Sequence, residues 1–183
     1  MRRALPLMLI VAFAALMALC AQINVPMAPV PMTMQTFAVL LTGAVLGPWR
    51  GTASVLLYLA AAALGLPILS DGASGVEPFA GPTAGYLFAF PVAAALVGAM
   101  FDRARNPVVE FGLMIAAHIL ILTMGAGWLA ISIGLTDALA YGATPFLIGM
   151  IVKSVLVVAV MKFLPFRGGG PRSGGGAPAT RTI

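Results

Sequence analysis

The sequence predicts an all-α fold, an integral membrane bundle of six transmembrane helices with both termini in the cytoplasm. Of its 183 residues, 61% are hydrophobic and only 8% are charged, whereas an ordinary soluble domain carries about 25% charged residues. The apolar residues form long continuous runs rather than the alternating pattern that the strands of a membrane barrel require. The length suits one domain, and a lipid bilayer is the solvent that this composition requires.

Six stretches are long and apolar enough to be membrane helices, since a crossing takes about 20 residues. We expect helices over residues 5–21, 32–46, 51–66, 83–100, 108–133 and 144–164. Proline bounds the shorter ones, because Pro31 precedes the second helix, Pro48 follows it and Pro67 follows the third. We expect these helices to form one membrane domain over residues 1–164. The Gly- and Pro-rich remainder, 165–183, is expected to be a flexible cytoplasmic tail.

Charged residues fall on alternate sides of the predicted helices. Every Lys and Arg except Lys153 precedes the first helix, lies at or after the end of the last one, or lies between helices two and three or four and five. The other three connections contain Asp71, Glu77 and Asp137 and no cation. The positive-inside rule then places both termini in the cytoplasm. A cleaved signal peptide is the alternative interpretation of the first helix, but cleavage would upset this alternation.

Several function classes are excluded by what the sequence lacks. Cys20 is the one cysteine and His118 the one histidine, which excludes an intramolecular disulfide and a multi-histidine metal site. The sequence has no G-x-x-x-x-G-K-[ST], H-E-x-x-H or G-x-S-x-G motif. We therefore expect neither an enzyme nor a bound cofactor or metal. Ten Lys and Arg residues without clustered aromatic residues also predict no nucleic-acid partner.

Lys153 is the most informative residue, because it lies among apolar residues inside the sixth predicted helix. A cation at this depth costs at least about 2.5–3.5 kcal/mol on insertion scales, so it is expected to face a cavity or a counter-ion. No carboxylate lies within one helical turn of it. We expect it to bind the carboxylate of a ligand that enters from the outer face. The alternatives are a side chain that reaches the membrane interface, or a pair with Glu77 or Asp137.

The outer loops have the composition of a covered site. Pro26, Pro29 and Pro31 predict a stiff, extended first connection, because proline fixes φ and forbids a helix. The connection over residues 67–82 is rich in Gly, Ser and Pro but contains apolar residues such as Phe79. This second loop is either a cap folded over a ligand or a loop packed on its own helix ends.

Residues on the predicted helices also allow a functional and a structural interpretation. Thr83 is expected to be the N-cap of the fourth helix. Tyr86 and Trp128 either line a pocket or lie in an interfacial aromatic belt. His118 and Glu110 can be interpreted in two ways as a pair: either they form a proton path, or His118 is a neutral histidine that is hydrogen-bonded between helices and Glu110 acts separately.

The first helix has a face of small residues. Ala14 and Ala18 are one turn apart on the same side of it, so another helix can approach closely there. That neighbour belongs either to the same bundle or to a separate membrane subunit.

Five stretches, taken in order, carry a family resemblance. They are residues 22–36 with the ending P-V-P-M-T-M-Q-T, residues 38–48 (A-V-L-L-T-G-A-V-L-G-P), residues 56–67, residues 81–87 (G-P-T-A-G-Y-L) and residues 145–153. Together they resemble BioY, the biotin-specific substrate-binding (S) component of energy-coupling-factor (ECF) transporters. The similar stretches span most of residues 5–164.

The resemblance implies a six-helix bundle that binds biotin on the outer face of the bacterial cytoplasmic membrane. Its implied partners are a transmembrane coupling subunit and two cytoplasmic ATPase subunits, which drive toppling of the loaded S component. In the family the small-residue face of the first helix contacts the coupling subunit, which here implies Ala14 and Ala18. The alternative function is a solitary vitamin carrier that works without ATPase partners.

The resemblance also implies a binding site with one departure. The family's sixth helix carries Gly-Asp-x-x-Lys, and this chain has Gly149-Met150-Ile-Val-Lys153. The lysine is expected to pair with the biotin carboxylate or another polar group, and Met150 cannot supply the acceptor that the ureido N–H groups require. We expect Gln35 or Glu77 to supply it. The predicted binding residues are Lys153, Gln35, Glu77, Phe79, Thr83, Tyr86 and Trp128.

Overall fold

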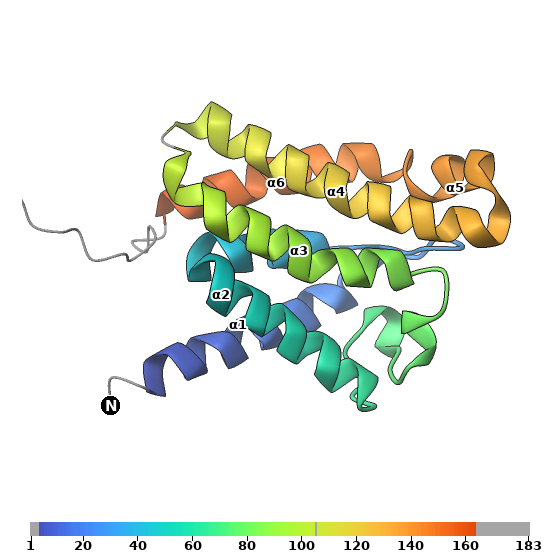
Figure 1. Cartoon of the computed structure of the whole chain (residues 1–183), viewed down its shortest axis with the longest axis horizontal. Helices are drawn as coiled ribbons and strands as arrows, with labels where there is room; N and C mark the ends of the chain where they lie inside the picture. Colours follow the sequence, from blue (N-terminus) through green and yellow to red (C-terminus); the bar gives the residue numbers. More distant parts are fainter. Residues whose placement is uncertain (1–3, 105, 164–183) are drawn as a thin grey trace, which may run out of the picture.

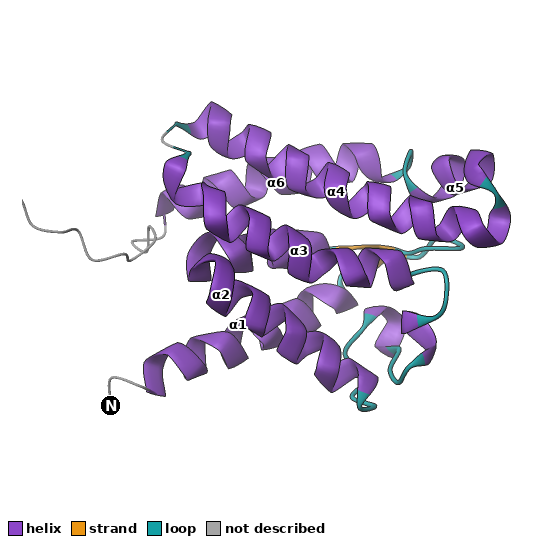
Figure 2. Cartoon of the chain, in the orientation of Figure 1, coloured by secondary structure: helices purple, strands orange, loops and turns teal. Residues whose placement is uncertain are grey.

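The computed structural model describes residues 4–104 and 106–163, and the predicted tail over 165–183 lies outside them. The described part is all-α, as predicted, apart from one short two-stranded ribbon (Figure 2). Its α-helices are α1 (Ala4–Gln22), α2 (Gln35–Ala63), α3 (Ala84–Met100), α4 (Pro107–Ile133), α5 (Leu135–Gly142) and α6 (Phe146–Phe163). The other elements are strands β1 (Asn24–Val25) and β2 (Met32–Thr33) and the 3₁₀ turns η1 (Ser70–Gly72), η2 (Glu77–Phe79) and η3 (Phe101–Arg103).

α2 contains the second and third predicted helices, joined by a bend. Gly47 at the bend has φ 75° and ψ −178°, and Pro48 follows it. Glycine adopts this positive φ without the steric cost that a Cβ would add, and proline suits the first turn of the helix that follows. The two halves diverge from the bend as a V (Figure 1). The predicted pair of helices is therefore present, but with a one-residue break in place of a loop.

The prediction of an extended first connection is wrong, because the segment between α1 and α2 folds back on itself. β1 pairs antiparallel with β2, with Asn24 opposite Thr33 and Val25 opposite Met32. The three prolines lie between the two strands, where they interrupt no ladder hydrogen bond. The second helix, predicted from residue 32, consequently begins at Gln35.

α5 is an eight-residue helix that was predicted as loop. Gly134, with φ 83°, separates it from α4. Eight residues are far fewer than a membrane crossing needs, so a search for long apolar runs could not find this helix. Asp137 lies in its first turn, where a carboxylate stabilises the helix N-terminus. The last helix begins after it, at Phe146 rather than at residue 144.

The core lies around α2 and α3. α3 packs against both α2 and α4, and α2 also packs against α1 and α6. Glycines make the α2–α3 packing close, since Gly43 lies against the backbone of Ala94 and Gly98 against the backbone of Gly47. Small residues of this kind let membrane helices approach until their backbones touch.

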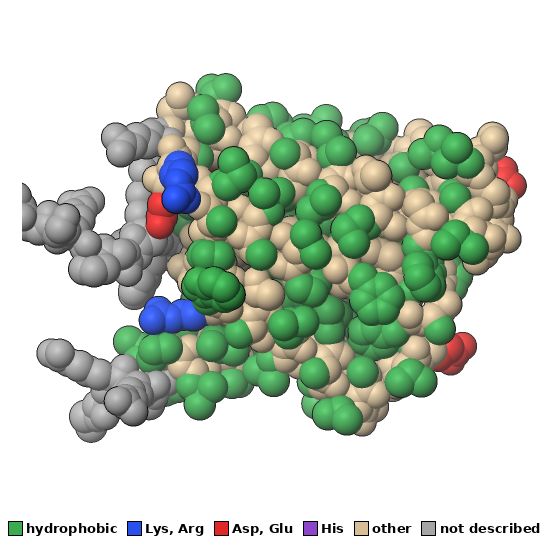
Figure 3. Space-filling view, in the orientation of Figure 1, with side chains coloured by type: hydrophobic (Ala, Val, Ile, Leu, Met, Phe, Trp, Pro, Cys, Tyr) green, Lys and Arg blue, Asp and Glu red, His purple; other side chains and the backbone are tan. Residues whose placement is uncertain are grey.

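The two ends of the bundle differ in charge. The Lys and Arg side chains in view lie at the end where α1 begins and α6 ends, whereas the charged side chains in view at the opposite end are all acidic (Figure 3). The opposite end carries η1, η2 and α5 (Figure 1). In the described part of the chain, α1, α3, α4 and α6 are the four helices long and apolar enough to cross a membrane. The bend divides α2 into two shorter halves.

Candidate functional site

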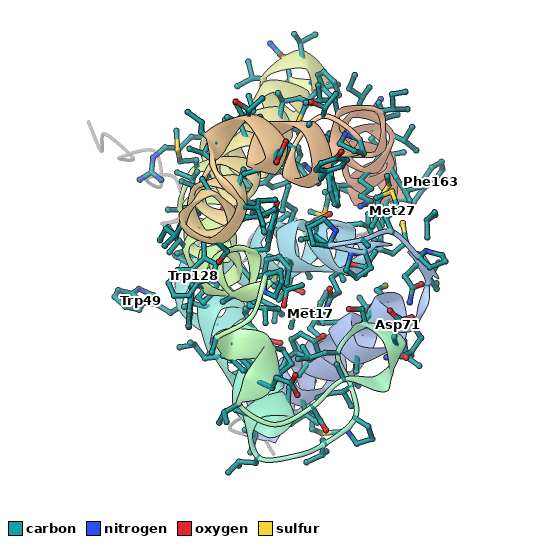
Figure 4. The ribbon with its side chains drawn as sticks, turned by 90° about the vertical axis from the view of Figure 1, so that its right-hand side faces the viewer. Met17, Met27, Trp49, Asp71, Trp128 and Phe163 are labelled. Carbon is teal, nitrogen blue, oxygen red and sulfur yellow. The ribbon has the colours of Figure 1, made fainter. Side chains whose placement is uncertain are left out.

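A cavity of about 420 Å³, here called the main cavity, lies at the end of the bundle that carries η1 and η2. Figure 4 looks onto this end. Residues 68–82, here called the lid, contribute to its wall, together with the ribbon and helices α2, α3, α4 and α6. Its polar lining residues are Thr33, Gln35, Thr36, Ser70, Asp71, Ser74, Glu77, Thr83, Tyr86 and Lys153. Within the described ranges, no three His, Cys, Asp or Glu side chains lie together as a metal site requires.

Lys153 reaches the main cavity from α6 and is 7% exposed. Its Nζ donates to the Thr33 carbonyl at 2.5 Å and to Thr36 Oγ1 at 3.2 Å. Among the described residues no carboxylate pairs with Nζ, so the predicted alternatives of a pair with a distant acid or of an interfacial position do not hold. An ammonium has three N–H donors. The third remains for a group inside the cavity.

Gln35 lines the main cavity, and its amide is held by its neighbours. Nε2 donates to Tyr58 OH at 2.5 Å, and Oε1 accepts from Thr33 Oγ1 at 2.9 Å. Tyr58 in turn donates to the carbonyl of Ile68 at 3.1 Å. The network therefore ties the start of α2 to the lid. An amide oxygen accepts two hydrogen bonds, so the acceptor role expected of Gln35 stays a prediction.

Two side chains, one on α1 and one in the ribbon, hold the lid by hydrogen bonds. Gln22 Nε2 donates to the carbonyl of Leu69 at 3.0 Å, and Asn24 Nδ2 donates to Asp71 Oδ1 at 3.0 Å. Asp71 and Trp128 lie on opposite sides of the bundle (Figure 4). Because residues of the lid line the main cavity, the lid has the position that a cap over a ligand would have.

Replacing Asn24 by alanine is expected to loosen the lid. The lost hydrogen bond is exposed, so its loss costs about 0.5–1 kcal/mol and speeds amide hydrogen exchange in residues 68–82 by roughly two- to fivefold. Exchange measured by mass spectrometry on the purified protein checks this. Asn106→Ala is the control, because Asn106 accepts from Val109 N at the start of α4. Equal lid exchange in the two variants would contradict the prediction.

Glu77, Thr83 and Phe79 have three different positions. Glu77 is exposed but contributes to the wall of the main cavity, as does Thr83. Thr83 is the N-cap residue of α3, as predicted, but its side chain makes no capping hydrogen bond and instead donates to the carbonyl of Pro78 at 3.1 Å. Phe79 is half-buried against the core, with its ring 6.3 Å from that of Phe88. It is not among the lining residues of the main cavity.

Tyr86 is a buried wall residue of the main cavity. Its hydroxyl donates to the carbonyl of Gly142 at 2.6 Å, and its ring stacks on that of Phe146 at 6.2 Å. Gly125 faces the ring so closely that an added Cβ would lie 2.2 Å from it. Tyr86 therefore fixes the end of α5 against α3 and α4 while its ring shapes the cavity.

Replacing Tyr86 by phenylalanine is expected to lower the unfolding temperature by roughly 2–4 °C. The variant keeps the ring but leaves the buried Gly142 carbonyl without this donor, at a cost of about 1 kcal/mol. Thermal unfolding of the purified protein measures the shift. The matched control is Tyr141→Phe, because Tyr141 is 55% exposed. An unchanged unfolding temperature for Tyr86→Phe would show that the hydrogen bond contributes nothing.

Trp128 lies at the periphery of the bundle (Figure 4) and is 37% exposed. Its Nε1 donates to the carbonyl of Gly81 at 3.1 Å, and Phe88 packs edge-on against it with ring centroids 6.1 Å apart. It is not among the residues that line the main cavity. Its place outside the main cavity therefore favours a position in an interfacial aromatic belt over a position in the pocket wall. Its hydrogen bond to Gly81 also holds the last residues of the lid.

The small-residue face of α1 meets this chain's own core. Ala14 is buried in the core, and Ala18 is half-buried against it. Ala15 and Leu19, one position further along the helix, are exposed. The role of Ala14 and Ala18 in contacting a separate subunit stays a prediction.

Thr33, Thr36 and His118 contribute polar groups to the site, although they were not among the predicted binding residues. Thr33 and Thr36 hold Lys153, although they lie 120 and 117 positions away in the sequence. His118 lies under the main cavity, in a smaller pocket described below. The available signal for the threonines was their position, on either side of Gln35 at the start of an apolar run.

The chain is similar in sequence and in fold to known proteins. The family model described as "BioY family" matches residues 2–167. The "Probable biotin transporter BioY" of Pyrococcus horikoshii is 37% identical over 156 residues, covering 85% of this chain and 93% of the relative. The "Biotin transporter BioY" of Rhodobacter capsulatus is 38% identical over 147 residues, covering 73% and 77%. A crystal structure of the S-component for biotin from an ECF-type ABC transporter superposes with a TM-score of 0.84 at 28% identity, covering 92% of this chain and 94% of the other.

Proposed function

Because the chain belongs to the BioY family, we propose that it binds biotin in the main cavity and imports it as the S component of an ECF transporter. The observation that carries this proposal is Lys153, a buried ammonium that lines a covered cavity and pairs with no carboxylate of the described residues. A protein keeps such a cation inside a membrane for a ligand or an ion path.

The main cavity suits biotin in size and chemistry. Its volume of about 420 Å³ lies within the roughly 300–1,000 Å³ of small-molecule sites. The apolar part of biotin is a sulfur-containing ring with a four-carbon chain, and its two polar groups are the cyclic urea fused to that ring and the carboxylate at the end of the chain. Leu87, Phe90 and Ile121 in the wall can cover the apolar part. Lys153 and the polar residues of the lid then meet the polar groups.

The same proposal includes six membrane crossings with both termini in the cytoplasm. α1, α3, α4 and α6 are long and apolar enough to cross singly, and the two halves of α2 would add a pair joined at the bend. The positive-inside rule supports the orientation, since Arg50 follows the bend, Arg103 lies in η3 and Lys162 ends α6. The main cavity would then open to the outside of the bacterial cytoplasmic membrane.

Import against a gradient needs an energy source outside this sequence, which lacks a nucleotide-binding phosphate loop. A transmembrane coupling subunit and two cytoplasmic ATPases would supply it. α1 is the proposed contact, with Ala18 at the edge of its exposed face beside Ala15 and Leu19. The relatives are transporters by name, which fits a protein without catalytic activity.

Equilibrium binding of radiolabelled biotin to the purified protein in detergent tests the proposal. We expect saturable, one-site binding with sub-micromolar Kd, competed by unlabelled biotin and unaffected by a vitamin without a ureido ring, such as thiamine. Binding no tighter than about 1 mM, or equal competition by thiamine, would overturn it. Uptake in biotin-auxotrophic cells, with and without the coupling and ATPase subunits, then separates the ECF-dependent transporter from the solitary carrier.

A further inference from the structure

A second, smaller pocket lies next to the main cavity. This inner pocket has a volume of about 20 Å³. It shares Thr36, Ile121, Leu122, Phe146 and Lys153 with the lining of the main cavity. Its volume is enough for about one water-sized group, so it is an extension of the main cavity rather than a site of its own. His118 and Met150 are the lining residues that it adds.

His118 lines this inner pocket, and its imidazole carries one hydrogen-bond acceptor. Its Nδ1 lies 3.1 Å from the carbonyl of Met114 and 3.1 Å from Ser154 Oγ. A carbonyl only accepts, so Nδ1 carries the proton. The imidazole is neutral, because a second cation beside Lys153 in an apolar pocket would be repelled and poorly solvated. Nε2 therefore carries a lone pair.

Nothing in the described part of the protein donates to that lone pair. His118 is 3% exposed, and its Nε2 is buried without a hydrogen-bond partner there. A buried polar atom left unpaired costs about 1–3 kcal/mol, so native proteins nearly always satisfy such atoms. Met150, across the same pocket, ends in a thioether and has no hydrogen to donate. A group that enters from the main cavity is the remaining source of a donor.

The inner pocket thus combines one donor and one acceptor. Lys153 offers its third N–H, and His118 offers Nε2. The positions of Lys153 and His118 are coupled. Ser154 follows Lys153 on α6, and its hydroxyl contacts the imidazole of His118, which lies on α4. A carboxylate could use the donor but not the acceptor. A carbonyl with an adjacent N–H uses both, and a cyclic urea presents that pair on one edge.

We propose that His118 is a ligand-binding residue whose Nε2 accepts a hydrogen bond from a ureido N–H of biotin. This rests on the proposed function. The ureido carbonyl accepts from Lys153, the ring lies at the floor of the main cavity, and only its N–H edge enters the inner pocket. The carboxylate then points toward the lid and the opening. His118 thereby supplies the acceptor that Met150 does not, in place of the Gln35 or Glu77 expected from the sequence.

The wild-type protein offers a direct test, since the sequence contains a single histidine. With a purification tag that contains no histidine, ¹⁵N-labelled histidine gives one pair of ring-nitrogen NMR signals. We expect biotin to shift the signal of the unprotonated nitrogen strongly, because it accepts a new hydrogen bond, and the signal of Nδ1 much less. Unchanged ring signals at saturating biotin would overturn the proposal.

Binding measurements on a variant give the second test. His118→Phe keeps a planar ring but removes the acceptor, and we expect about a tenfold loss of biotin affinity. Leu113→Met is the matched control on α4, because Leu113 is buried in the core and its replacement conserves volume. Thermal unfolding confirms that both variants are folded. Equal biotin affinity in His118→Phe and wild type would overturn the proposal.

Two biotin derivatives identify the group that faces His118. For biotin methylated on the ureido nitrogens, wild type and His118→Phe should bind equally, because the donor is gone. For biotin methyl ester, the tenfold difference between them should persist. The reverse pattern would mean that the carboxylate faces His118 and would overturn the proposal. Absence of biotin binding by wild type would instead count against the proposed function itself.

Discussion

Lys153→Met is expected to weaken biotin binding by about ten- to a hundredfold. A hydrogen bond from a charged donor contributes about 1.5–3 kcal/mol, which corresponds to that change in Kd. Methionine has nearly the length of the lysine side chain, so the wall of the main cavity keeps its shape. The variant also removes a buried cation that no carboxylate of the described residues neutralises, and burying such a charge is itself costly. Loss of affinity without loss of thermal stability is therefore the expected pair of results.

Lys162→Met is the matched control for this variant. Lys162 lies on the same helix, in its last turn and exposed, and the same change there should leave the Kd for biotin within about twofold. Calorimetry on both proteins in one detergent makes the comparison. Wild-type affinity in Lys153→Met would remove the basis of the site assignment, even if the fold and family stand.

The role of Lys153 could be predicted from sequence because its position carries an energetic penalty. A cation inside an apolar helix must be compensated, and the structure compensates it with the Thr33 carbonyl and the Thr36 hydroxyl. Which atoms do so could not be predicted, since they lie on another helix and the ribbon before it. Periodicity within one helix gives no information about partners so distant in sequence.

The aromatic residues show where such predictions stop. Tyr86 lines the main cavity, whereas Trp128 lies at the periphery. A soluble helix would separate these faces by polarity, but α3 contains no charged residue and α4 contains one, Glu110, among long apolar runs. When lipid replaces water outside, the lipid-facing and inward-facing sides of a helix look alike in sequence. Only packing distinguishes them.

The loops were predicted less well than the helices, for a related reason. The prolines correctly excluded a helix before residue 32, but proline is equally compatible with an extended segment and with a turn. The antiparallel pairing of β1 and β2 depends on hydrogen bonds between residues on either side of that turn. The break between the second and third predicted helices was expected over residues 47–50, and the structure has there a bend whose residue of positive φ is Gly47. Composition located these breaks without giving their geometry.

Gly98→Ala is expected to destabilise the fold strongly. A Cβ at Gly98 would lie 2.4 Å from the carbonyl carbon of Gly47 and 2.5 Å from the nitrogen of Pro48. Both are backbone atoms at the bend of α2, so no side chain can move aside. α3 must shift away from the bend, at a cost of about 2–3 kcal/mol, and the unfolding temperature should fall by roughly 5–10 °C.

Gly112→Ala is the matched control, because it adds the same methyl group at a position with open space. An added Cβ at Gly112, on α4, meets nothing within 4 Å, and alanine favours the helix by about 0.5–1 kcal/mol over glycine. Its unfolding temperature should equal or exceed that of wild type in the same thermal scan. If both variants unfolded at the same temperature, the tight backbone contact between α3 and the bend would not contribute to the stability of the fold. Since residues of the first half, Gln35 and Thr36, line the main cavity, Gly98→Ala should also weaken biotin binding, although it lies in another helix.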